Sequence, residues 1–265
     1  MENNLLFSDK FNSTTKNEIT DIIARESFFS MERAIDPKIV DKILSEVDLF
    51  KLKLNSTEIS SVHADDGYFS SNAMAKSNTL FKLLTSEKIL EISTQYLGDK
   101  FRLKCHRIYS TNPITRGAWH TDNKQYGDKD KKIKGLVVII YLNDVFDGEL
   151  QAIRKSHLIS DEYKYSNYDE DAINEFDKGD IASFKLPVGS IIIYDSRTIH
   201  RAKPYYSLLW RRKSLFFQID NEIDDGEKVL INSSFVNNID KRLFIYLGMG
   251  QKNNMPHEPN NNKIK

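Results

Sequence analysis

Two segments in the first hundred residues carry apolar side chains at helical spacing. The first has an N-cap aspartate and a proline at the first helical position, followed by apolar residues three and four positions apart: Asp36-Pro37, then Ile39, Val40, Ile43, Leu44 and Val47. The second, residues 85–97, repeats this spacing and is followed by Gly98, a residue typical of helix ends. Both patterns predict helices, whereas the polar stretch between them, residues 60–73, predicts a loop.

After residue 100 the pattern changes to short β-branched and aromatic runs separated by turn signals. The apolar run 136–142 predicts a buried strand, and the turn signal Asp147-Gly148 precedes another strand. Strands are predicted over residues 101–110, 136–142, 148–153, 188–195, 212–220, 228–236 and 242–248. Many short strands with irregular loops favour an antiparallel sandwich or barrel over a parallel sheet. The predicted fold class is α+β, mainly β, with N-terminal helices packed on the β core.

The chain shows no internal repeat and no long linker, so we expect a single domain over residues 1–265. Within it, residues 1–100 form a mainly helical support and residues 101–250 form the β core. The Asn- and Lys-rich residues 251–265 predict a disordered tail. The acidic, tyrosine-rich stretch 158–180 is interpreted as an insertion or long loop, and a lid over the site is one hypothesis for it.

Composition and charge exclude several classes of protein. Lys plus Arg and Asp plus Glu each total 38, so no basic excess predicts a nucleic-acid partner and no net charge predicts a membrane surface. The single cysteine, Cys105, cannot form an internal disulfide, which excludes a secreted disulfide scaffold. The N-terminus lacks the basic and apolar regions of a signal peptide, and the longest apolar runs are strand-sized. We therefore expect a soluble, cytoplasmic protein.

The segment WHTD, residues 119–122, can hold a metal ion. In an extended segment, residues i and i+2 face the same side, so His120 and Asp122 can bind one ion from the edge of a sheet. Two histidines and one carboxylate on one face leave the opposite positions open, which suits a non-haem Fe(II) that binds a cosubstrate and oxygen. The third ligand must come from another part of the chain.

A second His-x-Asp, His63-Ala64-Asp65, shows that the motif alone is not specific. Only the copy at residue 120 is followed by a strong buried strand and later by a Gly-led strand, residues 188–195, with His200 at its exit. A histidine on a neighbouring antiparallel strand can complete the triad. Arg211, which opens the next strand, can bind a carboxylate through two hydrogen bonds. We therefore interpret the copy at residue 63 as a loop motif and add His200 to the candidate metal ligands.

Several segments, in order, resemble the phytanoyl-CoA dioxygenase family of 2-oxoglutarate-dependent oxygenases. The resemblance covers roughly residues 90–220 and rests on YLG (96–98), WHTD (119–122), LNDVFDGELQAIRKSH (142–157), PVGSIIIYDSRTIHRA (187–202) and SLLWRR (207–212). It implies a double-stranded β-helix, a cupin-like jelly-roll barrel. It also implies Fe(II) as the metal, 2-oxoglutarate and O2 as cosubstrates, and release of succinate and CO2 as a substrate is hydroxylated.

The resemblance implies roles for individual residues. His120, Asp122 and His200 match the family's metal ligands. Arg211, eleven residues after His200, matches the arginine that binds the far carboxylate of 2-oxoglutarate. Arg212 is the fallback, because adjacent strand residues face opposite ways and only one of the two can serve.

Two positions depart from the family's pattern. Arg154-Lys155 stands where Pro-Gly is usual before Ser-His, and Ala202 stands where a small hydroxylic residue often follows the distal histidine. The second contact to 2-oxoglutarate is therefore open, with Arg107 and Ser110 on the strand before WHTD as candidates. Related halogenases lack the carboxylate that Asp122 supplies here, so its presence favours hydroxylation.

Three functions stay open. The first is hydroxylation of a small molecule: an acyl group, an amino-acid derivative, a sugar or a natural-product intermediate. The second is a cupin-type metal-binding barrel with other chemistry, which needs no arginine at position 211. The third is a catalytically inactive barrel used as a binding module, against which the intact triad argues. A protein substrate is also open, and the sequence predicts neither the substrate nor the oligomeric state.

Overall fold

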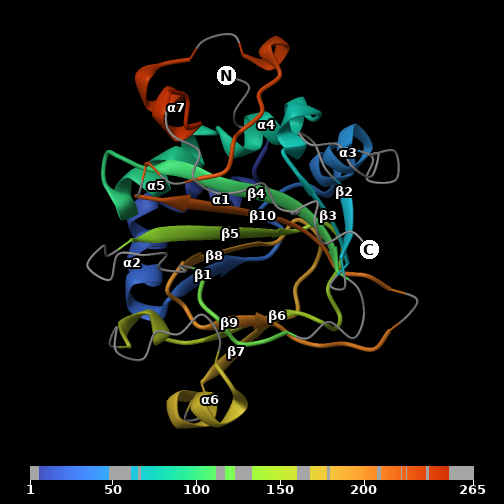
Figure 1. The fold of residues 1–265 in the computed structure, drawn as a ribbon, viewed down its shortest axis with the longest axis vertical. Coiled ribbons are helices and arrows are strands. Elements are labelled where there is room, and N and C mark those ends of the chain that lie inside the picture. The colour runs from blue at the N-terminus through green and yellow to red at the C-terminus, as the bar shows by residue number, and fades with distance from the viewer. Residues whose placement is uncertain are drawn as a thin grey trace.

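The computed structural model describes most of the chain between residues 6 and 250 (Figure 1). The described residues are 6–47, 61–64, 67–111, 117–122, 133–159, 168–177, 180–207, 210–221, 223–224, 226–236 and 239–250. The predicted tail, residues 251–265, lies outside them, as does Asp65 of the second His-x-Asp. The single domain over residues 1–265 stays a prediction.

The described residues form short helices and strands that alternate irregularly. The α-helices are α1 (Asp9–Ser13), α2 (Lys16–Glu26), α3 (Pro37–Val47), α4 (Asn78–Leu84), α5 (Glu87–Leu97), α6 (Glu170–Asp177) and α7 (Lys241–Tyr246). The strands are β1 (Phe28–Met31), β2 (Ser61–Ala64), β3 (Gly67–Ser71), β4 (Arg102–Thr111), β5 (Gly135–Tyr141), β6 (Leu150–Ile153), β7 (Ile181–Phe184), β8 (Ile191–Asp195), β9 (His200–Ala202) and β10 (Lys213–Asp220). Single 3₁₀ turns occupy Ala73–Ala75, Ser156–Leu158 and Ser233–Phe235.

The strands form two antiparallel sheets. The larger sheet has the order β1-β8-β5-β10-β4-β3-β2, and the smaller has the order β7-β6-β9. A bridge between His120 and His200 adds the segment 117–122 to the free side of β9. In Figure 1 the smaller sheet lies below the larger one, and helices α4 and α7 lie above the larger sheet. This is the double-stranded β-helix, or jelly-roll, architecture with helices packed on one side, as predicted.

The larger sheet has a different apolar core on each face. On the face toward the helices, Leu215, Phe217 and Ile219 of β10 join residues of α2 to α5 in the outer core. Between the two sheets, Phe216 packs against an inner core, which contains Phe28, Val137, Ile139, Tyr141, Val145, Leu150, Ala152, Phe184, Ile192 and Tyr194. The strict alternation of a strand sends neighbouring residues of β10 into these two cores.

Both predicted helices are confirmed. Helix α3 begins at Pro37, as the sequence predicts. The Ser86 side chain caps α5 by accepting a hydrogen bond from the Ile89 N–H, and the helix ends at Gly98, whose φ of 89° lies in the left-handed region.

Three other predicted elements are wrong. Residues 60–73 are not a loop but contain the hairpin β2–β3, and β3 pairs with β4. Residues 228–236 form no strand, because the side chain of Asn72 occupies backbone groups there: it donates to the Lys228 carbonyl and accepts from the Leu230 N–H. Residues 242–248 fall largely within helix α7, whose first turn is capped by the Asp240 carboxylate.

Among the described residues, no helix has the length and the apolar character that a membrane crossing requires.

Candidate metal centre

His120 and His200 lie opposite each other on adjacent extended segments. The backbone N–H of each donates to the carbonyl of the other, both at 2.9 Å. This is the hydrogen-bonded pair of an antiparallel ladder, which places the two side chains on the same face. Asp122 stands two residues beyond His120, so its side chain faces the same side, and its N–H donates to the Ser196 carbonyl at 3.1 Å.

Asp195, at the end of β8, holds the turn that leads to His200. Its carboxylate accepts hydrogen bonds from the Arg197 N–H and guanidinium at 2.8–2.9 Å and from the Tyr96 hydroxyl at 2.6 Å. Burial acts to raise the pKa of Asp195, but the hydrogen bonds and charge of Arg197 outweigh it and leave this pKa below its usual value. A charged, fully bonded carboxylate therefore positions the start of β9 and with it His200.

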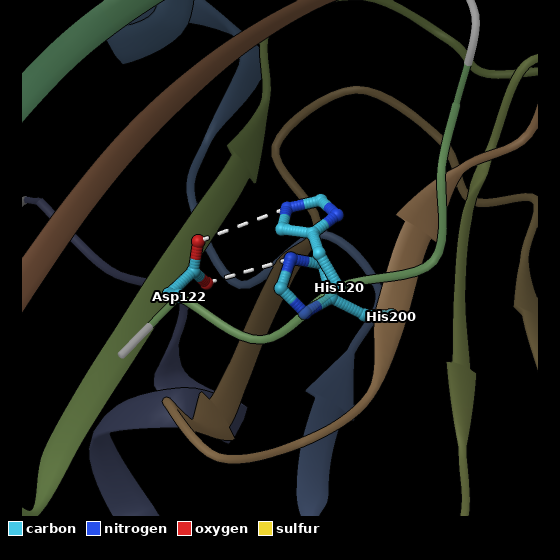
Figure 2. A group of neighbouring side chains, drawn as sticks. All are labelled: His120, Asp122 and His200. Atoms are coloured by element: carbon cyan, nitrogen blue, oxygen red, sulfur yellow. Dashed lines mark ion pairs between the residues drawn. The ribbon is translucent and has the colours of Figure 1, made fainter. Parts of the chain in front are cut away.

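The three candidate ligands converge at one point (Figure 2). Nε2 of His200 is 3.4 Å from Oδ2 of Asp122, and Nε2 of His120 is 4.0 Å from Oδ1. One ligand atom from each residue lies within 4.8 Å of the others. The two imidazole rings have centroids 4.4 Å apart. Two nitrogens and one carboxylate oxygen at this separation can share a single metal ion.

Backbone carbonyls fix the tautomer of both histidines. Nδ1 of His120 lies 2.8 Å from the Ala118 carbonyl, and Nδ1 of His200 lies 2.9 Å from the Thr198 carbonyl. Because a carbonyl only accepts, each Nδ1 carries the proton and each Nε2 presents its lone pair toward Asp122. Metal-binding histidines have the same arrangement, in which an outer partner orients the ring.

Burial also prepares His200 to bind a cation. It lowers the pKa of His200 to about 4, because desolvation disfavours the imidazolium, and the nearby Asp122 carboxylate only partly opposes this effect. The ring is therefore neutral near pH 7. His120 is more open, with 36% of its side chain exposed against 5% for His200, so the centre has one accessible side.

Tyr194 touches the centre, and the sequence analysis did not identify it. Its hydroxyl donates to Oδ2 of Asp122 at 2.9 Å and lies 3.2 Å from Nε2 of His200. Burial raises the pKa of Tyr194 well above its usual value, so the phenol keeps its proton. The available signal was a tyrosine at an inward position of an otherwise aliphatic strand, six residues before His200.

The two candidate arginines face opposite ways. Arg211 is exposed, whereas Arg212 is only 9% exposed and interacts electrostatically with Tyr141 and Tyr205. The Arg212 guanidinium donates to the Gly148 carbonyl and, at 3.2 Å, to Thr111 Oγ1. Its Nε has no hydrogen-bond partner among the described residues. Burial lowers the pKa of Arg212, but a guanidinium stays charged in proteins.

The carbonyl of Gly148 accepts a hydrogen bond from Arg212. The φ of this glycine, 63°, lies in the left-handed region, and a Cβ there would lie 2.4 Å from the Tyr205 ring. Only glycine therefore fits the turn after Asp147, which brings the Gly148 carbonyl to Arg212.

The candidates for a second cosubstrate contact lie on opposite faces of β4. The Arg107 guanidinium lies over the ring of Phe216, on the inner face, and pairs there with the buried carboxylate of Glu227. Ser110 is three residues further along β4 and pairs in register with Lys213, so it faces the other side. Of the two, only Arg107 shares the space between the sheets.

Trp119 belongs to packing on the far side of the smaller sheet. Its side chain, 1% exposed, lies in a small core with Ile153, Tyr168, Ile173 and Ile199. The Tyr168 N–H donates to the Trp119 carbonyl at 2.8 Å, and the Arg201 guanidinium lies 4.3 Å from the Trp119 ring. The described part of the 158–180 insertion therefore packs against the extended segment that carries His120.

Two antiparallel sheets with two histidines and an aspartate converging on one point present the donor set typical of non-haem Fe(II) proteins. Comparison with known families agrees. The model of the phytanoyl-CoA dioxygenase (PhyH) family matches residues 28–213, more than half of the chain, and the protein belongs to this family. The metal and cosubstrates of the family are Fe(II), 2-oxoglutarate and O2.

Among solved structures, the chain is similar to the non-heme alpha ketoglutarate dependent carbocyclase SnoK from nogalamycin biosynthesis. The TM-score is 0.62 and the sequence identity 18%, over 79% of this chain and 85% of that chain. At this identity the likeness shows a shared fold. No curated protein matches the chain.

Proposed function

We propose that this protein is a 2-oxoglutarate-dependent dioxygenase that hydroxylates a small-molecule substrate and releases succinate and CO2. The observation that carries the proposal is the convergence of His120, Asp122 and His200, with both Nδ1 atoms held by backbone carbonyls. This donor set fits Fe(II), because three ligands on one face leave room for a cosubstrate and oxygen. A cytoplasmic location also stays a prediction.

The chain's own residues bind and orient the reactants. His120, Asp122 and His200 would hold the Fe(II), which with 2-oxoglutarate and O2 supplies the oxidising chemistry. Neutral His200 needs no deprotonation near pH 7, so it can bind a cation without proton release. The apolar inner core around Val137 and Ile192 excludes water from one side of the centre.

We assign the far carboxylate of 2-oxoglutarate to Arg212. The sequence resemblance favours Arg211, but the contacts support its neighbour. Arg212 is buried, faces Tyr141 of the inner core, and keeps an Nε–H without a hydrogen-bond partner among the described residues. A buried guanidinium with a donor to spare suits a carboxylate ligand. Thr111 Oγ1, already bonded to this guanidinium, is a second polar group beside it.

The first experiment is an anaerobic titration of the Fe(II)-loaded protein with 2-oxoglutarate, read by the visible charge-transfer band of the chelate. We expect the band in the wild type and none in His200→Ala. Arg212→Met should need about ten- to hundredfold more 2-oxoglutarate, since a hydrogen bond to a charged group contributes about 1.5–3 kcal/mol. Arg211→Met is the matched control and should stay close to the wild type.

Each other outcome has a definite meaning. A reversed order of the two arginine variants would restore Arg211 as the cosubstrate ligand. Iron binding without a band would favour a cupin-type metal barrel, and no metal binding would favour a binding module. With the band established, substrates are found by succinate release. Product mass then separates gain of one oxygen from ring closure, the reaction that the name of the carbocyclase indicates.

A further inference from the structure

The hydroxyl of Tyr194 lies between the Asp122 carboxylate and the His200 ring, two of the three groups that would hold the metal. It is 2.9 Å from Oδ2 of Asp122 and 3.2 Å from Nε2 of His200. The phenol ring also packs against the His200 ring, with centroids 4.8 Å apart. Side chains that hold metal ligands in this way tune the ion without binding it.

With a metal ion bound, the Tyr194 hydroxyl would have only one hydrogen-bond acceptor among these groups. A tyrosine hydroxyl has a single proton to donate. The lone pair of His200 Nε2 would be used by the metal, because Nδ1 carries the ring's proton and bonds the Thr198 carbonyl. The hydroxyl then donates only to Oδ2 of Asp122, which leaves Oδ1 as the oxygen that faces the ion.

The strand that carries Tyr194 gives it little freedom to move. Tyr194 is 1% exposed in the inner core, and β8 is paired on both sides, with Phe28 of β1 and Val137 of β5 in register with Tyr194. A hydroxyl held this firmly is set in place before the metal arrives, so it can impose an orientation on Asp122.

We propose that Tyr194 is a positioning residue that keeps Asp122 a one-oxygen ligand. The proposal rests on the proposed function, because it concerns the space that 2-oxoglutarate needs. A carboxylate that binds through both oxygens fills one more position on the metal. Two histidines and a one-oxygen aspartate leave three of six octahedral positions free, enough for a two-atom chelate and O2. Losing the Tyr194 hydroxyl would let Oδ2 compete with the cosubstrate.

The test compares Tyr194→Phe with Tyr246→Phe. Both remove one hydroxyl from a buried tyrosine, and Tyr246 bonds the Leu84 carbonyl in the outer core, away from the metal ligands. The 2-oxoglutarate affinity is measured anaerobically at saturating Fe(II), together with Mn(II) affinity and thermal stability. We expect Tyr194→Phe to weaken 2-oxoglutarate about tenfold or more, in line with other outer partners of metal ligands. Tyr246→Phe should leave that affinity unchanged.

A purely structural role would lower the stability of both variants alike and leave the affinity at saturating metal as in the wild type, which overturns the proposal. A crystal structure of the wild type with Mn(II) tests it without any variant. One Asp122 oxygen on the metal and the other on Tyr194 supports it, and two oxygens on the metal overturn it. A wild type without a chelate band contradicts the proposed function instead, and the Mn(II) structure still decides what Tyr194 does.

Discussion

The two faces of the larger sheet differ in the kind of side chain that they bury. On the outer face, β10 contributes Leu215, Phe217 and Ile219 to an apolar core closed by helices. On the inner face, the same strand follows buried Arg212 and contributes Ser214, Phe216 and Gln218. On the inner side, Arg212 keeps an Nε–H without a hydrogen-bond partner among the described residues. The candidate metal ligands His120, Asp122 and His200 converge next to the inner core, on segment 117–122 and β9.

This contrast indicates how one strand serves stability and function together. Apolar packing needs no partner beyond the chain, whereas buried polar groups cost free energy until they are fully bonded. The outer face should therefore govern the free energy of unfolding, and the inner face should govern ligand binding.

The largest effect should come from two adjacent phenylalanines. Phe217→Ala in the fully buried outer core should lower the free energy of unfolding by about 3–5 kcal/mol, because it leaves a cavity. Phe216→Ala, at a half-buried inner position, should cost about 1–2 kcal/mol. Urea denaturation of the metal-free protein measures both. Equal losses would mean that the two faces contribute equally to stability.

A smaller effect should appear in the pH dependence of stability. His106 is buried on the outer face, where its Nε2 accepts from the Met74 N–H at 3.4 Å. Burial, aided by the charge of Arg107, lowers the pKa of His106 to about 3 from the usual 6.5. Below pH 6.5, His106 binds a proton in the unfolded chain but stays neutral in the folded protein. The free energy of unfolding therefore falls as the pH falls, by about 1.4 kcal/mol per pH unit.

The variant His106→Leu isolates this contribution. Between pH 6.5 and 4.5 its stability should fall by about 2–3 kcal/mol less than that of the wild type, both measured without metal so that His200 contributes equally. Parallel pH profiles would show that His106 becomes charged in the folded protein at the same pH as in the unfolded chain.

The smallest predicted effect lies on the far side of the smaller sheet. Arg201 stacks on Trp119 and donates to Gln151 at 2.9 Å and to Glu170 at 2.6 Å. Arg201→Ala should lower the free energy of unfolding by about 1 kcal/mol, the range of a cation–π contact. It should also weaken Mn(II) binding slightly, since Trp119 precedes His120. Arg201→Lys keeps the charge, and its free energy of unfolding should lie between those of the wild type and Arg201→Ala. Unchanged Mn(II) binding in Arg201→Ala would show that the packing of Trp119 does not affect the metal centre.

The sequence predicts well those parts of the molecule that follow from local alternation. The run at 136–142 reads as a buried strand because every residue is apolar, and β5 is buried along its whole length. His120 and Asp122 come together because residues two apart in an extended segment share a face. The sequence also places His200 beside them, since it follows the last residue of a buried strand by a short turn.

The sequence predicts poorly those features that depend on contacts with distant residues. The run at 242–248 is rich in strand-forming residues, but Asp240 caps a helix and Tyr246 and Leu247 then face the outer core. The choice between Arg211 and Arg212 depends on the exact register in which the chain enters β10, because a shift of one residue exchanges the side chains between the two faces. The contact of Tyr194 with Asp122 joins residues 72 positions apart, so the tyrosine in an aliphatic strand indicates an inward side chain but not its partner.

The bridge between His120 and His200 also bears on the lifetime of the protein. The two residues are 80 positions apart, so an ion bound to both would close a long loop of chain. A ligand present at a thousand times its dissociation constant stabilises the folded state by about 4 kcal/mol. Loss of the ion would then lower the stability of the folded protein and expose the chain to unfolding and proteolysis.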